Sequence, residues 1–238
     1  MLPADLEALP KLNGFRLRGL EMTRLETFID AAFAFAVTIL VIAGGQPPRN
    51  VSLLLDAFRD VPVFIASISI IGIFWCGHWR WSRRYGLEDG VSVLISWGMM
   101  VTILIYVYPL RLLFNGMIYF ISGHHLGHTL QVRSEFEARA MFALYAIGFA
   151  AIAGEILLLN WRAWHLREAL RLNAREVAMT RNEIVGWSVP LSIGLVSLIL
   201  ALTLPVRWVD WSGWIYFLLA LITPISRRLL RRNLDAEK

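Results

Sequence analysis

The sequence is poor in charged residues and has almost no cysteine, and both shortages narrow what the protein can be. Charged side chains make up 17% of its 238 residues and hydrophobic ones 57%, whereas soluble domains are about 25% charged. The single cysteine, Cys76, excludes a disulfide within the chain and a structural zinc site built on cysteines. An apolar excess of this size predicts that much of the surface faces lipid.

Catalytic and phosphate-binding motifs are also missing. The sequence has no Gly-rich phosphate loop, no nucleophile elbow and no His-Glu-x-x-His metal helix. Its net charge of +5 would suit nucleic acid, but the arginines lie between apolar segments, where they act as topology signals. We therefore expect neither an enzyme nor a nucleic-acid-binding protein, and we expect no metal site and no cofactor.

Long apolar runs are what the sequence does contain, and six of them can cross a hydrocarbon core of about 30 Å. None alternates with the period of two that a barrel needs, so each run should be a helix whose backbone groups pair internally. The sequence predicts an all-α membrane protein with one domain over residues 1–238. The expected spans are 26–43, 61–79, 91–113, 138–159, 184–203 and 211–226.

Basic residues are distributed unevenly between the two sides of these spans. With the N-terminus inside, the inner segments hold 17 of the 23 Lys and Arg residues. This asymmetry follows the positive-inside rule and predicts that both termini are cytoplasmic. The inner stretch at 160–183 is expected to continue the fourth span as a cytoplasmic helix. Trp75, which lies near the end of the second span, is interpreted as an interface anchor.

Ionisable residues open the first span. Arg24, Glu26 and Asp30 stand at or inside the start of an otherwise apolar helix, where burying a charge is costly. Arg24 and Asp30 are about 240° apart around a helix, so they cannot pair on one straight helix and need partners from other helices. His78 is the candidate partner of Asp30. The alternative is that His78 is an interfacial histidine and that Arg24 reaches lipid headgroups.

A stripe at helical spacing follows Asp30 in the first span. It consists of Ala31, Phe35, Thr38 and Ile42, and Thr38 is its only polar member. Such a stripe fits ordinary helix packing or a pore lining, and spacing does not decide between them.

The motif Arg24-x-x-x-Phe28-x-Asp30 and the segment FWCGH ending at His78 resemble the transmembrane protein 175 family of potassium channels. The resemblance covers the first span and, less closely, the second. It implies six spans per chain and a homotetramer in the lipid bilayer, in a bacterial plasma membrane. It also implies a passive pore for potassium that needs no cofactor.

The same resemblance implies a pore lined by four copies of the first span, with Ala31 on the lining stripe. It assigns a hydrophobic constriction to Phe35, Ile39 and Ile42, and it assigns a hydroxyl that favours potassium to Thr38. We therefore expect this channel to prefer potassium and to be constricted hydrophobically.

Arg24, Phe28, Asp30 and His78 are assigned by the resemblance to a polar lock that holds helices together rather than to ion binding. The sequence departs from the family pattern at Ile29, where a serine is usual. It also departs at Phe35, where isoleucine or leucine is usual. Four phenyl rings either seal a narrow pore or offer their faces to a cation.

Two other functions remain open from the sequence. A proton-coupled secondary transporter would use Asp30, Glu155 and His78 as a relay, although the first span has neither Gly nor Pro before Gly44 and so lacks the signature of a broken helix. A non-conducting membrane scaffold is the other alternative. Phe35 supports it, because four phenyl rings that seal a narrow pore would prevent conduction.

Two further groups carry ionisable side chains. His124 and His128 could share a helix face beside His125, but we interpret them as an outer-loop cluster rather than a metal site. Glu155 lies within the fourth span, and we expect it to pair with an inner arginine or with His165.

Overall fold

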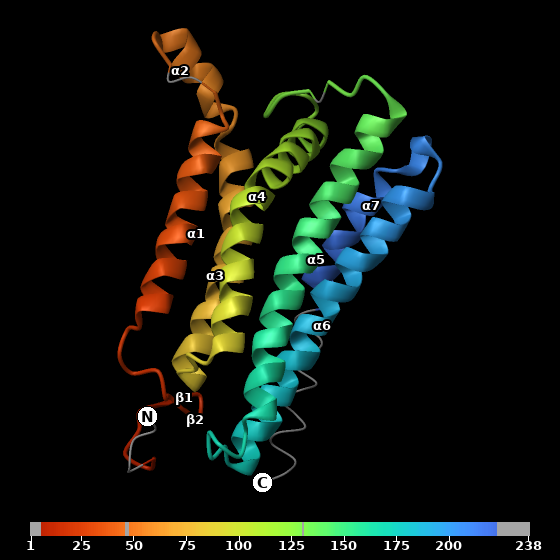
Figure 1. Cartoon of the computed structure of the whole chain (residues 1–238). Helices are drawn as coiled ribbons and strands as arrows, with labels where there is room; N and C mark the ends of the chain where they lie inside the picture. The colour runs from red at the N-terminus through yellow and green to blue at the C-terminus, as the bar shows by residue number, and fades with distance from the viewer. Residues whose placement is uncertain (1–5, 46–47, 130, 223–238) are drawn as a thin grey trace.

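The computed structural model describes residues 6–45, 48–129 and 131–222, and long helices lying side by side dominate it (Figure 1). Five of its helices are long and apolar enough to cross a membrane. They are α1 (Arg24–Ile42), α3 (Val61–Tyr85), α4 (Gly90–Ile121), α5 (Glu135–His165) and α6 (Ala174–Thr203). The all-α fold and the first five expected spans are therefore confirmed.

Short elements lie at the two ends of this bundle (Figure 1). A two-stranded hairpin, β1 (Lys11–Leu12) and β2 (Phe15–Arg16), precedes α1, and α2 (Val51–Phe58) follows α1 at the opposite end. After α6 come the 3-10 turn η1 (Val206–Trp208), α7 (Trp211–Trp214) and the 3-10 turn η2 (Ile215–Phe217). Asn13 and Gly14 both have positive φ, which suits the two-residue turn of the hairpin.

Local sequence signals set the helix ends. The Thr23 side chain accepts a hydrogen bond from the backbone N–H of Glu26 and so caps the start of α1. Gly86, in the left-handed conformation at φ 57°, ends α3. Asn173 and Glu176 form a reciprocal capping box that starts α6.

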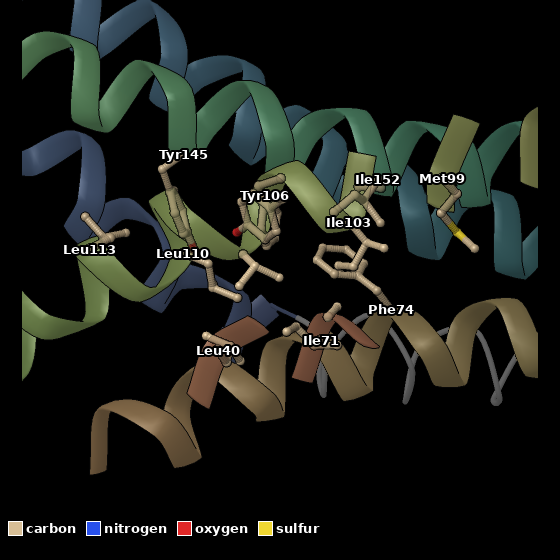
Figure 2. Packing of buried hydrophobic residues seen from close by; sticks show 14 of the residues in the cluster. Leu40, Ile71, Phe74, Met99, Ile103, Tyr106, Leu110, Leu113, Tyr145 and Ile152 are labelled. Atoms are coloured by element: carbon tan, nitrogen blue, oxygen red, sulfur yellow. The ribbon is translucent and has the colours of Figure 1, made fainter. Parts of the chain in front are cut away.

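The hydrophobic core lies where α1, α3, α4 and α5 meet (Figure 2). The ring of Tyr106 on α4 packs at 5.5 Å from the ring of Tyr145 on α5. Gly148 permits this approach, because a Cβ at that position would collide with the Tyr106 ring. The labelled members of the cluster are Leu40, Ile71, Phe74, Met99, Ile103, Tyr106, Leu110, Leu113, Tyr145 and Ile152.

The expected sixth span, 211–226, is seen only in part. Residues 211–222 form α7, η2 and a short helical continuation, and they contain no candidate span by length and composition. Positions 223–226 lie outside the described residues. The described architecture is thus five candidate spans followed by a short helical segment.

The stretch at 160–183 was expected to continue the fourth span as one helix, but it does not form a continuous helix. The helix α5 ends at His165, the chain turns, and Arg171 adopts a positive φ of 49°. The next helix, α6, begins at Ala174, ten residues before the expected start of the span, because the capping box at Asn173 nucleates it there.

Candidate pore helix and its polar contacts

The helix α1 has one face that the chain covers and one that it leaves open. Ile29, Phe33, Ala36 and Leu40 are buried against α3 and α4. On the open face, Ala31 and Thr38 are exposed, Phe35 is 56% exposed and Ile42 is 67% exposed. The stripe of Ala31, Phe35, Thr38 and Ile42 expected from the sequence therefore lies together on the uncovered face. The fifth expected residue, Ile39, is partly buried and packs against the core.

Thr38 is the one hydroxyl on this stripe. Its Oγ1 lies 3.2 Å from the carbonyl oxygen of Ala34, one turn earlier, and donates to it. A hydroxyl has a single hydrogen, so this bond leaves the oxygen lone pairs of Thr38 available on the open face.

The contacts of Asp30 and His78 differ from the pairing that the sequence suggested. Asp30 Oδ1 accepts a hydrogen bond of 2.8 Å from Nε1 of Trp75. His78 is buried, and its Nε2 lies 3.2 Å from Oγ of Ser96 on α4. Trp75 therefore contacts α1, whereas His78 contacts α4. Trp75, expected from the sequence to be an interface anchor, is thus the residue of the FWCGH segment that contacts Asp30.

Arg24 and Phe28, the remaining residues of the predicted lock, are both exposed. Arg24 forms no ion pair with any residue that the structure describes. The neighbouring Glu26 is instead buried, and its Oε1 lies 3.5 Å from Nε of Arg83 on α3. Arg83 Nη1 also donates to the carbonyl oxygens of Gly19 and Leu20, so it ties the N-terminal end of α1 to the segment before it. From the sequence, Arg83 is only one of the basic residues that predict topology.

A second arginine holds the C-terminal end of α1. Arg111 on α4 donates from Nη1 to the carbonyl oxygen of Leu40 at 2.7 Å and from Nη2 to Oδ2 of Asp60 at 2.9 Å. His128 Nε2 lies 3.3 Å from the other oxygen of Asp60. Both ends of α1 are thus fixed by guanidinium groups from neighbouring helices.

Of the remaining ionisable residues, the histidines lie in a turn, and only Glu155 departs from its expected pairing. His124 has a positive φ of 73° in a turn, so it does not share a helix face with His128. Within the described ranges, no group of three or more His, Cys, Asp or Glu side chains could hold a metal ion. Glu155 Oε1 lies 2.9 Å from Oγ1 of Thr102 on α4, because its depth in the bundle brings it to α4 and not to the inner arginines.

Comparison with known proteins shows which family this chain resembles. A family described as the endosomal/lysosomal potassium channel TMEM175 matches residues 24–109. A potassium channel from Marivirga tractuosa is 32% identical over 228 residues, which cover 92% of each chain. The chain belongs to the TMEM175 family of potassium channels.

Solved structures agree with membership of the TMEM175 family. The potassium channel MtTMEM175, crystallised as a variant with a nanobody fusion, matches with a TM-score of 0.81 and 29% identity over 94% of this chain and all of that one. A TMEM175 homologue from Chamaesiphon minutus has a TM-score of 0.56 and 22% identity over 85% of this chain and 95% of that one, which shows a shared fold. Membership identifies an integral membrane protein of an ion-channel family and not an enzyme.

Proposed function

We propose that this chain is one subunit of a homotetrameric channel that conducts potassium in preference to sodium through a pore lined by four copies of α1. The uncovered face of α1 carries the proposal: Ala31, Phe35, Thr38 and Ile42 lie on it in line, while the opposite face is packed into the bundle. One chain supplies one such helix, so a closed pore needs several chains, most simply in a four-fold ring. Relatives named as potassium channels support the choice of ion.

The side chains on this face have two different functions in the proposed pore, constriction and contact with the cation. Phe35 and Ile42 are large and apolar, so a ring of them would narrow the pore and resist wetting. Ile39, partly buried, borders that constriction. Thr38 lies between Phe35 and Ile42, and its oxygen lone pairs suit a partly dehydrated cation.

The polar lock would act between helices rather than on the ion. The Trp75 bond to Asp30 joins α3 to α1 within one chain. Arg24 and Phe28 are exposed, so they are available to a neighbouring subunit. His78 holds α3 to α4 through Ser96. We further propose six spans with both termini cytoplasmic, in a bacterial plasma membrane.

The test is cation flux from liposomes that contain the purified full-length protein. We expect a potassium gradient to drive faster flux than an equal sodium gradient, and Thr38→Ala to reduce this preference. Thr38→Ser is the matched control, because it keeps the hydroxyl and should keep the preference. Absence of flux for either cation from an intact oligomer would refute conduction, and unchanged selectivity in Thr38→Ala would refute the role of Thr38.

A further inference from the structure

A cavity of about 400 Å³ lies in the turn that follows α6, between η1 and α7. The turn is near the end of the bundle opposite the β1–β2 hairpin (Figure 1), on the side that the distribution of basic residues predicts to be outside. Its lining consists of Arg207, Trp208, Asp210, Trp211 and Trp214. None of these residues takes part in the proposed pore or in the contacts of α1.

Two opposite charges line this cavity without neutralising each other. Arg207 and Asp210 are three residues apart and exposed, yet neither forms an ion pair with the other or with any residue in the described part of the chain. Cζ of Arg207 lies 6.0 Å from the centroid of the Trp208 ring. Both charged groups are therefore exposed on this surface and can each bind a group of opposite charge.

Packing beneath the cavity fixes the backbone of the turn and the ring of Trp214. Ser212 is fully buried, its Oγ donates to the carbonyl oxygen of Val209, and its own carbonyl oxygen accepts from Ser197 on α6. The ring of Trp214 stacks on Phe217 at 5.4 Å and meets Phe120 of α4 edge to face at 6.1 Å. The turn is thus a fixed platform that presents three indoles and two charges to the membrane surface.

We propose that this cavity binds the headgroup of a zwitterionic phospholipid. Arg207 would hold the phosphate, and Asp210 with the indole faces would hold the ammonium group, since carboxylates and tryptophan faces both attract such cations. Phe120 and Phe217 are exposed beside Trp214 and offer an apolar surface to the acyl chains. An anionic headgroup without an amine would leave Asp210 unpaired next to a phosphate, so it binds less tightly. The proposal does not depend on conduction.

Native mass spectrometry of the full-length protein in detergent tests this proposal, with phosphatidylethanolamine and phosphatidylglycerol added in turn. We expect the protein to retain phosphatidylethanolamine more strongly, and we expect Asp210→Asn to lower that preference about 3-fold to 10-fold, as for a lost exposed ion pair with a cation–π contact. Asp56→Asn removes an exposed acid on α2 and should change nothing. The double exchange Arg207→Asp with Asp210→Arg retains both charges and should restore binding.

Three results would overturn the proposal. The first is equal retention of the two lipids by the unaltered protein. The second is an undiminished preference in Asp210→Asn that elutes as the same oligomer. The third is a changed number of chains per complex in that variant with unchanged lipid retention, because the cavity would then be a contact between copies of this chain.

Discussion

Phe35 stands on the open face of α1, directly before the turn that carries Thr38, and its ring is the largest side chain on the stripe. If four such rings narrow the pore, Phe35→Ile should raise potassium flux severalfold, because the shorter side chain widens the constriction. Phe136→Ile removes an exposed ring on α5 and serves as the control. Absence of flux in both the unaltered protein and Phe35→Ile would favour a scaffold over a channel.

Trp75 gives a second test at the scale of one residue. Trp75→Phe keeps an aromatic ring but removes the N–H that Asp30 accepts, so a partly buried carboxylate loses its donor. We expect a loss of about 1–3 kcal/mol in the free energy of unfolding. Thermal unfolding in detergent measures it, with Trp97→Phe on the exposed face of α4 as the control. Equal melting temperatures for both variants would contradict the importance of this bond.

For Asp30, the sequence predicted that a partner was needed from another helix but not which residue it is. Its need for a partner from another helix followed from the angle between Arg24 and Asp30, and the structure supplies that partner from α3. The identity of the partner depended on which way each side chain leaves α3. Trp75 and His78 are close in sequence and depth, so the pattern of residues did not distinguish them, whereas packing against Ser96 does.

At the scale of elements, the long helices were predictable and the short ones were not. Lipid demands long apolar helices, and that demand leaves a strong signal in the sequence. The helix α2 and the β1–β2 hairpin are too short for such a signal, and α6 starts early because of a cap and not because of hydrophobicity. Residue spacing predicted the open stripe on α1. Spacing did not decide whether the stripe lines a pore or packs against another helix, and the family resemblance favoured a pore.

Glu176 joins the hairpin to α6 and is itself fully buried. Its carboxylate pairs with Arg16 at 2.8 Å and Arg18 at 2.9 Å, and both guanidinium groups are also nearly buried. Glu176→Gln leaves the buried Arg18 without a counter-charge and leaves Arg16 with only the exposed Glu7, so we expect about 3–5 kcal/mol of destabilisation. Denaturant unfolding of the purified protein measures this. Glu168→Gln, at an exposed acid of the same inner stretch, should cost almost nothing; comparable losses in the two variants would contradict the argument.

Asp89 makes the junction of α3, α4 and α5 sensitive to acid. Burial of its carboxyl opposes ionisation, but hydrogen bonds from Ser92 and Arg162 outweigh it and lower the pKa of Asp89. A lowered pKa in the folded state stabilises the fold above the unfolded value of about 4, and this stabilisation disappears as the pH falls through the folded pKa.

Asp89→Asn should therefore melt at a lower temperature than the unaltered protein at pH 6, and the difference should shrink towards pH 3. Melting curves across this range check the prediction, and Glu88→Gln is the neighbouring control. A difference that stays constant with pH would show that charge at Asp89 is not what stabilises the junction.

At the scale of the whole molecule, the open face of α1 decides how copies assemble. If four chains place this face around one axis, native mass spectrometry should give a complex of four chains of 27.1 kDa each. In a Cys76→Ser background, Ile42→Cys should form disulfides between chains, because the outer ends of four α1 helices would converge. Leu94→Cys, at the 72% exposed position on α4, should not cross-link if that face meets lipid. A complex of another size would refute the four-fold ring, and cross-linking at Leu94 without cross-linking at Ile42 would place the subunit contact on α4 and remove α1 from the pore.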